Sequence, residues 1–166
     1  PDSILKTEDN SILKDISHTN SIHKIYIAGM GGIENIKKND VIVIYRTAED
    51  GKAARYNSVF TSICVVEDYK NLIEFESYAD FNTYCKKYSI FEDIELEKIY
   101  KEKKYKHVVK MTYNTSLNKR INRDKLIDMG IMSNERSFYS GFGILTSNQL
   151  ISVMQTGSVN ESLIIN

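Results

Sequence analysis

The sequence is poor in the features that mark common enzyme and membrane-protein classes. It has no Trp, one Pro and two Cys among 166 residues, and no apolar run approaches the roughly 18 residues of a membrane span. The glycine-rich segment at residues 29–32 lacks the GxxxxGK(S/T) spacing of a phosphate-binding loop. His18, His23 and His107 are separated and have no Cys or carboxylate partner at ligand spacing. We therefore predict neither a metal site nor an organic cofactor.

An excess of charge of one sign is also missing. Lys and Arg together number 22, as do Asp and Glu, and the formal net charge is zero. Proteins that grip a long nucleic-acid duplex gain affinity from many phosphate contacts and usually have a basic excess. The balanced charge therefore argues against a broad duplex-binding groove. A small pocket with a few local cations stays compatible with it.

The chain does contain enough apolar and aromatic residues for one domain. Hydrophobic residues make up 42% of the sequence, with 11 Tyr and 6 Phe, and a chain of this length forms one core of ordinary size. Cys64 and Cys85 fall in apolar runs, which favours buried thiols in a reducing compartment such as the cytoplasm over a disulfide. We predict a linker or N-terminal arm at residues 1–21, a domain at residues 22–156 and a flexible tail at residues 157–166.

The order of predicted strands and helices indicates an α+β fold. Apolar runs predict strands at residues 22–30, 41–46, 56–68 and 107–113. Capping signals predict helices that begin after Ser77, Ser89, Asn122 and Thr146. Strands come first and helices are inserted between the later strands. This order suits a mixed β pseudo-barrel with helices packed at its ends better than a doubly wound fold.

The strongest functional signal lies in two strand-like runs, residues 39–47 and 58–67. Polar and aromatic side chains gather at or near the ends of these otherwise apolar runs: Tyr45, Arg46, Thr47, Ser58 and Thr61. A tyrosine face stacks on a base with about 1–3 kcal/mol, an arginine fork suits a phosphate or base edge, and hydroxyls hydrogen-bond without charge. The alternative is structural, with Tyr45 in the core, Arg46 paired with Asp40 or Glu67, and the hydroxyls on a solvent-facing side.

Further candidates lie later in the chain. We predict that Phe91 lines a ligand pocket; the alternative is that it packs in the hydrophobic core. Lys119, Arg120 and Asn122 belong to the densest short basic cluster and include a hydrogen-bonding amide. Close to a pocket, this cluster would hold flanking phosphates. A solvated loop is the alternative for it.

The ordered series of segments resembles the PUA-like superfamily, within it the branch that includes EVE and ASCH domains. The similarity is carried, over about residues 22 to 155, by IHKIYIAGM, KKNDVIVIYRT, SVFTSICVVE, YCKKYSIFEDIEL, KRINRDKLIDMGI and SGFGILTSNQLISVM. The chain looks most like the PUA-like module at the C-terminus of bacterial proteins that also carry PIN nuclease or GNAT acetyltransferase domains. Two features depart from the pattern. Asn39-Asp40 stands where Gly-Asp is common, and residues 51–55 only mimic the GxKxxxR-type ASCH signature.

The resemblance implies a domain that binds RNA or a modified nucleobase, often with one flipped-out base in a cleft. We therefore predict recognition of a single base, or a short single-stranded segment, of RNA or DNA. Tyr45 and Phe91 would sandwich the base, while Arg46, Lys119 and Arg120 would hold adjacent phosphates. The other predicted partners are further domains of a larger cytoplasmic parent protein, with no membrane.

Two alternatives from other classes stay open. The first is a small ASCH-type hydrolase that acts on a modified nucleoside. It would need a Lys or Ser activated by a neighbouring carboxylate, such as Lys110 or Lys119. The second is a structural docking domain that contacts an attached nuclease or acetyltransferase domain and binds no ligand.

Overall fold

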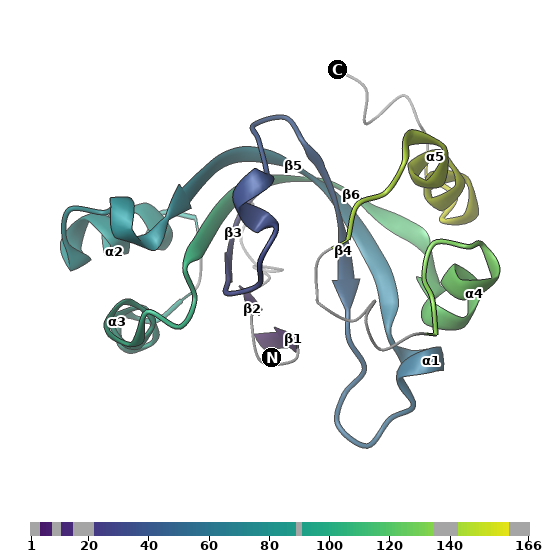
Figure 1. Cartoon of the computed structure of the whole chain (residues 1–166), viewed down its shortest axis with the longest axis horizontal. Coiled ribbons are helices and arrows are strands. Elements are labelled where there is room, and N and C mark those ends of the chain that lie inside the picture. The colour runs from purple at the N-terminus through teal and green to yellow at the C-terminus, as the bar shows by residue number, and fades with distance from the viewer. Residues whose placement is uncertain (1–3, 8–10, 15–21, 89–90, 135–142, 160–166) are drawn as a thin grey trace. The chain divides into compact units, whose positions relative to one another are not determined.

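Six strands form one sheet in the computed structural model, which describes residues 4–7, 11–14, 22–88, 91–134 and 143–159. The strands are β1 (Ile4–Thr7), β2 (Ser11–Lys14), β3 (His23–Ala28), β4 (Val41–Arg46), β5 (Val59–Asn71) and β6 (His107–Asn122). Their order in the sheet is β1-β2-β3-β6-β5-β4 (Figure 1). The pairs β1–β2, β2–β3 and β3–β6 are antiparallel.

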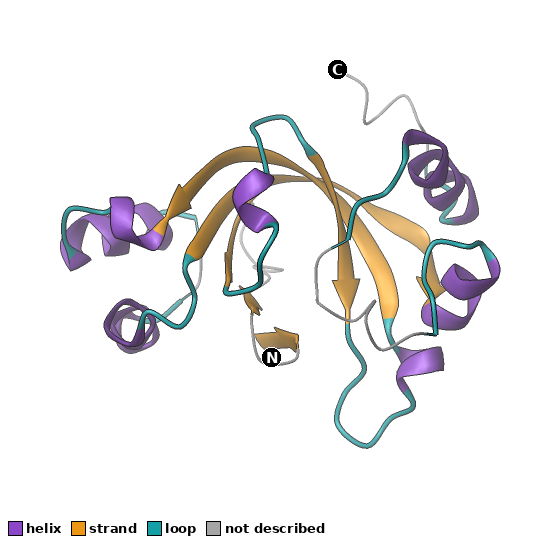
Figure 2. Ribbon diagram, viewed as in Figure 1, coloured by secondary structure: helices purple, strands orange, loops and turns teal. Residues whose placement is uncertain are grey.

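The chain also forms helices and short 3₁₀ turns between and after the strands (Figure 2). They are α1 (Ala54–Asn57), α2 (Tyr78–Lys86), α3 (Asp93–Glu102), α4 (Arg123–Asp128) and α5 (Ser147–Thr156), with the 3₁₀ turns η1 (Ile33–Asn35) and η2 (Leu72–Glu74). The predicted α+β class is confirmed. The described strands do not confirm a pseudo-barrel, because their order begins at β1 and ends at β4 and the sheet is open. Strands β1 and β2 extend the edge beside β3 instead of closing the sheet.

Strand β5 begins and ends three residues later than the predicted strand at residues 56–68, because residues 54–57 form α1. Two other parts of the sheet differ more strongly from the prediction. Strands β1 and β2 lie within residues 1–21, where we expected a linker or arm, and they pair in register with each other. Strand β6 continues to Asn122, whereas the predicted strand ended at residue 113. The added half of β6 is mostly polar, with Leu117 and Ile121 buried. Too few apolar residues alternate there to identify a strand from sequence.

The chain divides into two compact units, each with a buried apolar cluster. The first unit comprises residues 1–40 and 65–113, and the second comprises residues 41–64 and 114–166. The core of the first unit contains Ile25, Ile27, Leu72, Phe75, Phe81, Cys85, Phe91, Leu96, Ile99 and Val108. The core of the second unit contains Phe60, Ile63, Leu117, Ile121, Leu126, Ile131, Val153, Met154 and Val159. Strands β5 and β6 contribute residues to both units.

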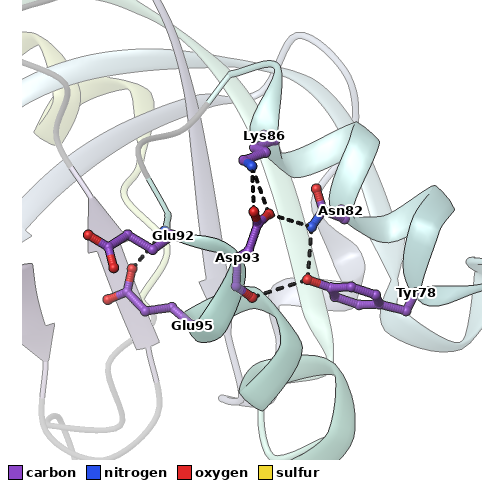
Figure 3. A network of polar contacts seen from close by, with 6 residues as sticks. All are labelled: Tyr78, Asn82, Lys86, Glu92, Asp93 and Glu95. Atoms are coloured by element: carbon purple, nitrogen blue, oxygen red, sulfur yellow. Dashed lines mark hydrogen bonds and ion pairs between the residues drawn. The ribbon is translucent and has the colours of Figure 1, made fainter.

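Polar contacts join α2 to α3 in the first unit (Figure 3). The Lys86 ammonium lies 2.7 and 2.8 Å from the two oxygens of the Asp93 carboxylate. The Asn82 side chain donates to the same carboxylate at 2.9 Å, and the Tyr78 hydroxyl donates to the Asp93 carbonyl at 3.1 Å. Asp93 also lies in the first turn of α3, where a negative charge complements the helix dipole. These contacts fix the start of α3 against α2.

The helix starts follow local capping chemistry. Ser77 accepts from the Asp80 N–H at 3.2 Å before α2, Asn122 accepts from the Lys125 N–H at 3.0 Å before α4, and Thr146 caps α5, as predicted. The predicted start of α3 at Ser89 lies outside the described residues. The observed capping box of α3 uses Glu92 with Glu95 instead (Figure 3).

Among the described residues, no helix has the length and apolar character that a membrane crossing requires.

Candidate functional site

Four polar side chains from three neighbouring strands meet in the first unit. His23 begins β3, Glu67 lies on β5, and Lys110 and Thr112 lie on β6. Residues two apart on a strand face the same side of a sheet, and His23 is the cross-strand partner of Thr112. Because β6 lies between β3 and β5, residues distant in sequence come together. We call these four residues the Glu67 cluster.

The Glu67 carboxylate is the centre of the cluster. Its Oε1 atom accepts a hydrogen bond from the Thr112 hydroxyl at 2.5 Å and lies 2.6 Å from Nδ1 of His23. Its Oε2 atom lies 3.0 Å from the Lys110 Nζ atom. An ionised carboxylate only accepts hydrogen bonds, and both Thr112 and Lys110 supply donors to it. One carboxylate thus contacts three polar side chains from two neighbouring strands.

These contacts keep Glu67 and Lys110 charged. Partial burial raises the pKa of Glu67, but hydrogen bonds from Thr112 and Lys110 outweigh burial, and the pKa lies below its ordinary value. Burial likewise lowers the pKa of Lys110, yet its contacts with Glu67 and Tyr88 raise the pKa overall. At neutral pH the cluster therefore holds a carboxylate and an ammonium group. Lys110 acts as a hydrogen-bond donor and not as an amine nucleophile.

Tyr88, two residues after the end of α2, places an aromatic ring beside the Glu67 cluster. The Lys110 Nζ atom lies 3.8 Å from the centroid of the Tyr88 ring, within the range of a cation–π contact. The His23 and Tyr88 ring centroids are 5.2 Å apart, and the ring planes are inclined at 60°. Ring faces, a charged acceptor and a charged donor are the groups that proteins use to stack on a base and read its edge.

The cluster is sheltered and still reachable from solvent. The side chains of Glu67, Lys110 and His23 are 25%, 18% and 34% exposed. Partial removal from water strengthens electrostatic contacts and hydrogen bonds relative to the open surface. The three side chains are therefore partly accessible to solvent.

The predicted strand-end residues lie in the second unit. Tyr45 packs against the second core, and its ring meets Phe60 edge-on at a centroid distance of 5.8 Å. Its hydroxyl is buried, and no group in the described part of the chain hydrogen-bonds to it. Arg46 and Thr47 are half-buried. Glu67, which the structural alternative paired with Arg46, contacts Lys110 and His23 instead.

The two predicted hydroxyls bond to the backbone of the second unit. Ser58 is 1% exposed, its Oγ atom accepts from the Ala48 N–H at 2.9 Å, and its carbonyl accepts from the Arg123 N–H at 2.9 Å. The Thr61 hydroxyl lies 3.4 Å from the Ile44 carbonyl oxygen. These contacts stabilise the connection from β4 to β5.

The predicted basic cluster belongs to the end of β6 and not to a loop. The side chains of Lys119 and Arg120 are exposed, and the Lys119 backbone N–H donates to the Gly157 carbonyl at 3.1 Å. Asn122 is half-buried, and its side-chain oxygen caps α4. The two cations are therefore available on the surface of the second unit, whereas the amide has a structural contact.

Phe91 belongs to the first unit, unlike the other eight predicted residues. It is 2% exposed and lies in the first core. This burial leaves little of the ring surface for stacking on a base. The structural role that we gave as its alternative matches the observed position.

Sequence reasoning missed most of the Glu67 cluster. It identified Lys110 only as a candidate for hydrolase chemistry, and it passed over His23, Thr112 and Tyr88 as ligand-binding groups. The available signal was that Lys110 and Thr112 interrupt an apolar strand at a spacing of two. Their partner on β5 becomes evident only from the strand order.

Comparisons with known proteins identify no relative of this chain. No family model, curated protein or solved structure matches it. Within the described residues, no group of three or more His, Cys, Asp or Glu side chains is arranged to hold a metal ion.

Proposed function

We propose that the first unit binds a nucleobase at the Glu67 cluster and that the chain is a nucleic-acid-binding module. The observation that carries the proposal is a half-exposed carboxylate that holds Lys110 at 3.0 Å and His23 at 2.6 Å. The Glu67 carboxylate accepts from an amino or imino N–H of a base, and Lys110 donates to a ring nitrogen or carbonyl. A base edge presents such donors and acceptors side by side.

The favoured ligand is one unpaired base of RNA or DNA. A base inside a duplex must be flipped out of its stack to reach a half-buried cluster, which costs a few kcal/mol and costs least for an unpaired or modified base. The zero net charge of the chain agrees with local recognition better than with a long electrostatic groove. Lys119, Arg120 and Arg46 belong to the second unit, where they are proposed to contact backbone phosphates independently of the base site.

The proposal includes the wider assignment made from sequence. The chain would be a PUA-like module with an open sheet, from the C-terminal part of a larger bacterial protein that acts in the cytoplasm. Its other partners would be the PIN or GNAT domains of that parent protein. The α+β class supports this assignment only at the level of fold class.

Binding to short oligonucleotides tests the proposed function. The parent protein and Glu67→Gln are titrated with single-stranded and duplex RNA and DNA that carry different and methylated bases, at two salt concentrations. We expect base-dependent binding by the parent. Removing a charged hydrogen-bond partner costs about 1.5–3 kcal/mol, so Glu67→Gln should weaken that binding by roughly 10- to 100-fold.

A matched control removes a charge elsewhere in the first unit. Lys98 lies on α3 and its side chain is 72% exposed, so Lys98→Gln should leave base-dependent binding unchanged. Circular dichroism and urea unfolding establish that each variant is folded. Equal binding by the parent, a folded Glu67→Gln variant and Lys98→Gln would contradict the assignment of the base to this cluster.

A second candidate function is hydrolysis of an acylated nucleoside, favoured by the contacts of Glu67 with Lys110 and Thr112. In this scheme Glu67 takes a proton from a water molecule, whose oxygen attacks the acyl carbon. The Lys110 ammonium stabilises the oxyanion that forms on the acyl oxygen. The carbon–nitrogen bond then breaks as protonated Glu67 returns the proton to the leaving amine, and a carboxylic acid and a nucleoside are released.

Product analysis separates hydrolysis from binding. The protein is incubated with nucleosides that carry an N-acyl group, and the released acid is measured. Turnover by the parent that Lys110→Met and Glu67→Gln abolish, and that Lys98→Gln retains, would establish the hydrolase. Binding of the acylated nucleoside with no released acid would leave a binding module.

A further inference from the structure

Two lysine side chains from different elements converge on Tyr88. Lys87 follows the last residue of α2, and Lys110 lies on β6. Their Nζ atoms lie 5.3 and 3.8 Å from the centroid of the Tyr88 ring. Tyr88 is half-buried and Lys87 is exposed, so this part of the cluster faces solvent. Two ammonium groups thus lie near one aromatic ring.

The charge at this position is not balanced within the described residues. Glu67 neutralises Lys110 at 3.0 Å. No described carboxylate lies in ion-pair contact with Lys87. The nearby ammonium groups also lower the pKa of the Tyr88 phenol, that of Lys87 foremost. The surroundings of the phenolic oxygen therefore stabilise negative charge.

Ammonium and hydroxyl groups that converge on one point form a typical site for a phosphate oxygen. A phosphate offers several acceptors, and charge-assisted hydrogen bonds to it are stronger than neutral ones. The second ammonium near Tyr88 becomes favourable once an anion lies between the two lysines. A free nucleoside has no group of this kind, whereas a nucleotide has one attached to the sugar of the base.

We propose that a phosphate group binds between Lys87, Lys110 and the Tyr88 hydroxyl, so that the ligand of the first unit is a nucleotide and not a free nucleoside. The inference rests on the proposed function, because the base of that nucleotide is taken to occupy the Glu67 cluster. It adds Lys87 and Tyr88 as determinants of ligand class. The phosphate is either a terminal monoester or an internal diester of a strand.

Calorimetric titration distinguishes these ligands. The parent protein is titrated with inorganic phosphate, nucleosides, nucleoside monophosphates and dinucleotides, each at two salt concentrations. We expect nucleotides to bind at least about tenfold more tightly than nucleosides, as charge-assisted hydrogen bonds predict. Tighter binding of monophosphates assigns a terminal phosphate, and tighter binding of dinucleotides assigns an internal diester.

Three variants test which residues cause the preference for nucleotides over nucleosides. Lys87→Gln should remove most of the preference for nucleotides and reduce the salt dependence of binding by about one unit of slope, with nucleoside affinity unchanged. Tyr88→Phe keeps the ring and loses the hydroxyl, and it should remove part of the preference. Lys98→Gln removes the same charge from α3 and should behave as the parent.

The outcomes separate the two proposals. Equal affinity for nucleosides and nucleotides, with Lys87→Gln indistinguishable from Lys98→Gln, would overturn the phosphate site and leave base binding intact. Binding of inorganic phosphate and nucleotides with no dependence on the base would retain the phosphate site and overturn the proposed function. Absence of binding to every ligand would overturn both.

Discussion

In the second unit the Ser58 hydroxyl and the Asn122 amide bond to backbone N–H groups, whereas in the first unit Glu67 bonds to the side chains of Thr112, Lys110 and His23. Both units carry polar groups on otherwise apolar strands. Side chains that bond to local backbone stabilise loops and helix ends. A half-exposed network of side chains instead keeps groups that a ligand can contact. The kind of partner distinguishes groups with a structural contact from groups that we propose to bind a ligand.

The largest expected effect concerns Phe91, a predicted base-contacting residue. Because its ring is buried in the first core, Phe91→Ala should lower the free energy of unfolding by about 3–5 kcal/mol. Urea unfolding measures this loss, and Phe91→Leu should be less destabilising because it retains more of the buried volume. Unchanged stability with selective loss of base binding would return Phe91 to the binding site.

Ser58 should show the next largest effect. Ser58→Ala leaves the partly buried Ala48 N–H without its hydroxyl acceptor, and an unsatisfied buried donor costs up to about 1–3 kcal/mol. Thr61→Val is the comparison, and it should cost less because the Thr61 bond is long at 3.4 Å. Neither change should alter oligonucleotide binding by protein that is folded. A binding defect in stable Ser58→Ala protein would contradict the structural role that we assign to Ser58 in the second unit.

Asn122 tests the same contrast at a helix end. Asn122→Ala removes the side-chain acceptor for the Lys125 N–H and should lower the free energy of unfolding by about 1 kcal/mol. Asn122→Asp provides a matched control, since aspartate also caps a helix. Thermal unfolding compares the three proteins. If Asn122→Asp were as unstable as Asn122→Ala, the amide would have a role other than capping.

The smallest expected effect is the pH dependence due to His107. Its Nδ1 atom lies 2.8 Å from the Tyr69 hydroxyl. Burial lowers the pKa of His107 below its ordinary value of 6.5, while Glu34 partly offsets this effect. Between the unfolded and folded pKa values, the unfolded chain binds more protons, so stability decreases as the pH falls below 6.5.

Unfolding at neutral pH and at about pH 5 measures this dependence. His107→Gln should flatten the fall in stability over this range. Glu34→Gln should steepen it, because the variant loses the negative charge that favours protonated His107. A parent protein that becomes more stable on acidification would contradict the assignment to His107.

Short-range chemistry made several elements predictable. The bounds of β4 agree with the predicted strand at residues 41–46, and the caps at Ser77, Asn122 and Thr146 lie where sequence placed them. A cap depends on a side chain and a backbone N–H three residues away, so sequence contains both partners. The capping box at Glu92 escaped prediction because an acidic residue replaced the expected serine.

The site was harder to predict because its members lie far apart in the chain. His23, Glu67 and Lys110 are joined only through the order β3-β6-β5. The candidates at Ser58 and Asn122 looked functional because sequence shows a polar side chain without its hydrogen-bond partner. The fold supplied those partners from neighbouring backbone.

Local sequence patterns were sufficient to predict the α+β class, most strands of the sheet and the starts of three helices. These depend on periodicity and capping, which act over a few residues. The open sheet and the contacts of Glu67 with Lys110, His23 and Thr112 follow from the three-dimensional fold alone. Strand pairing over long sequence distances is selected by the packing of the whole core, so no local pattern specifies which polar groups will meet.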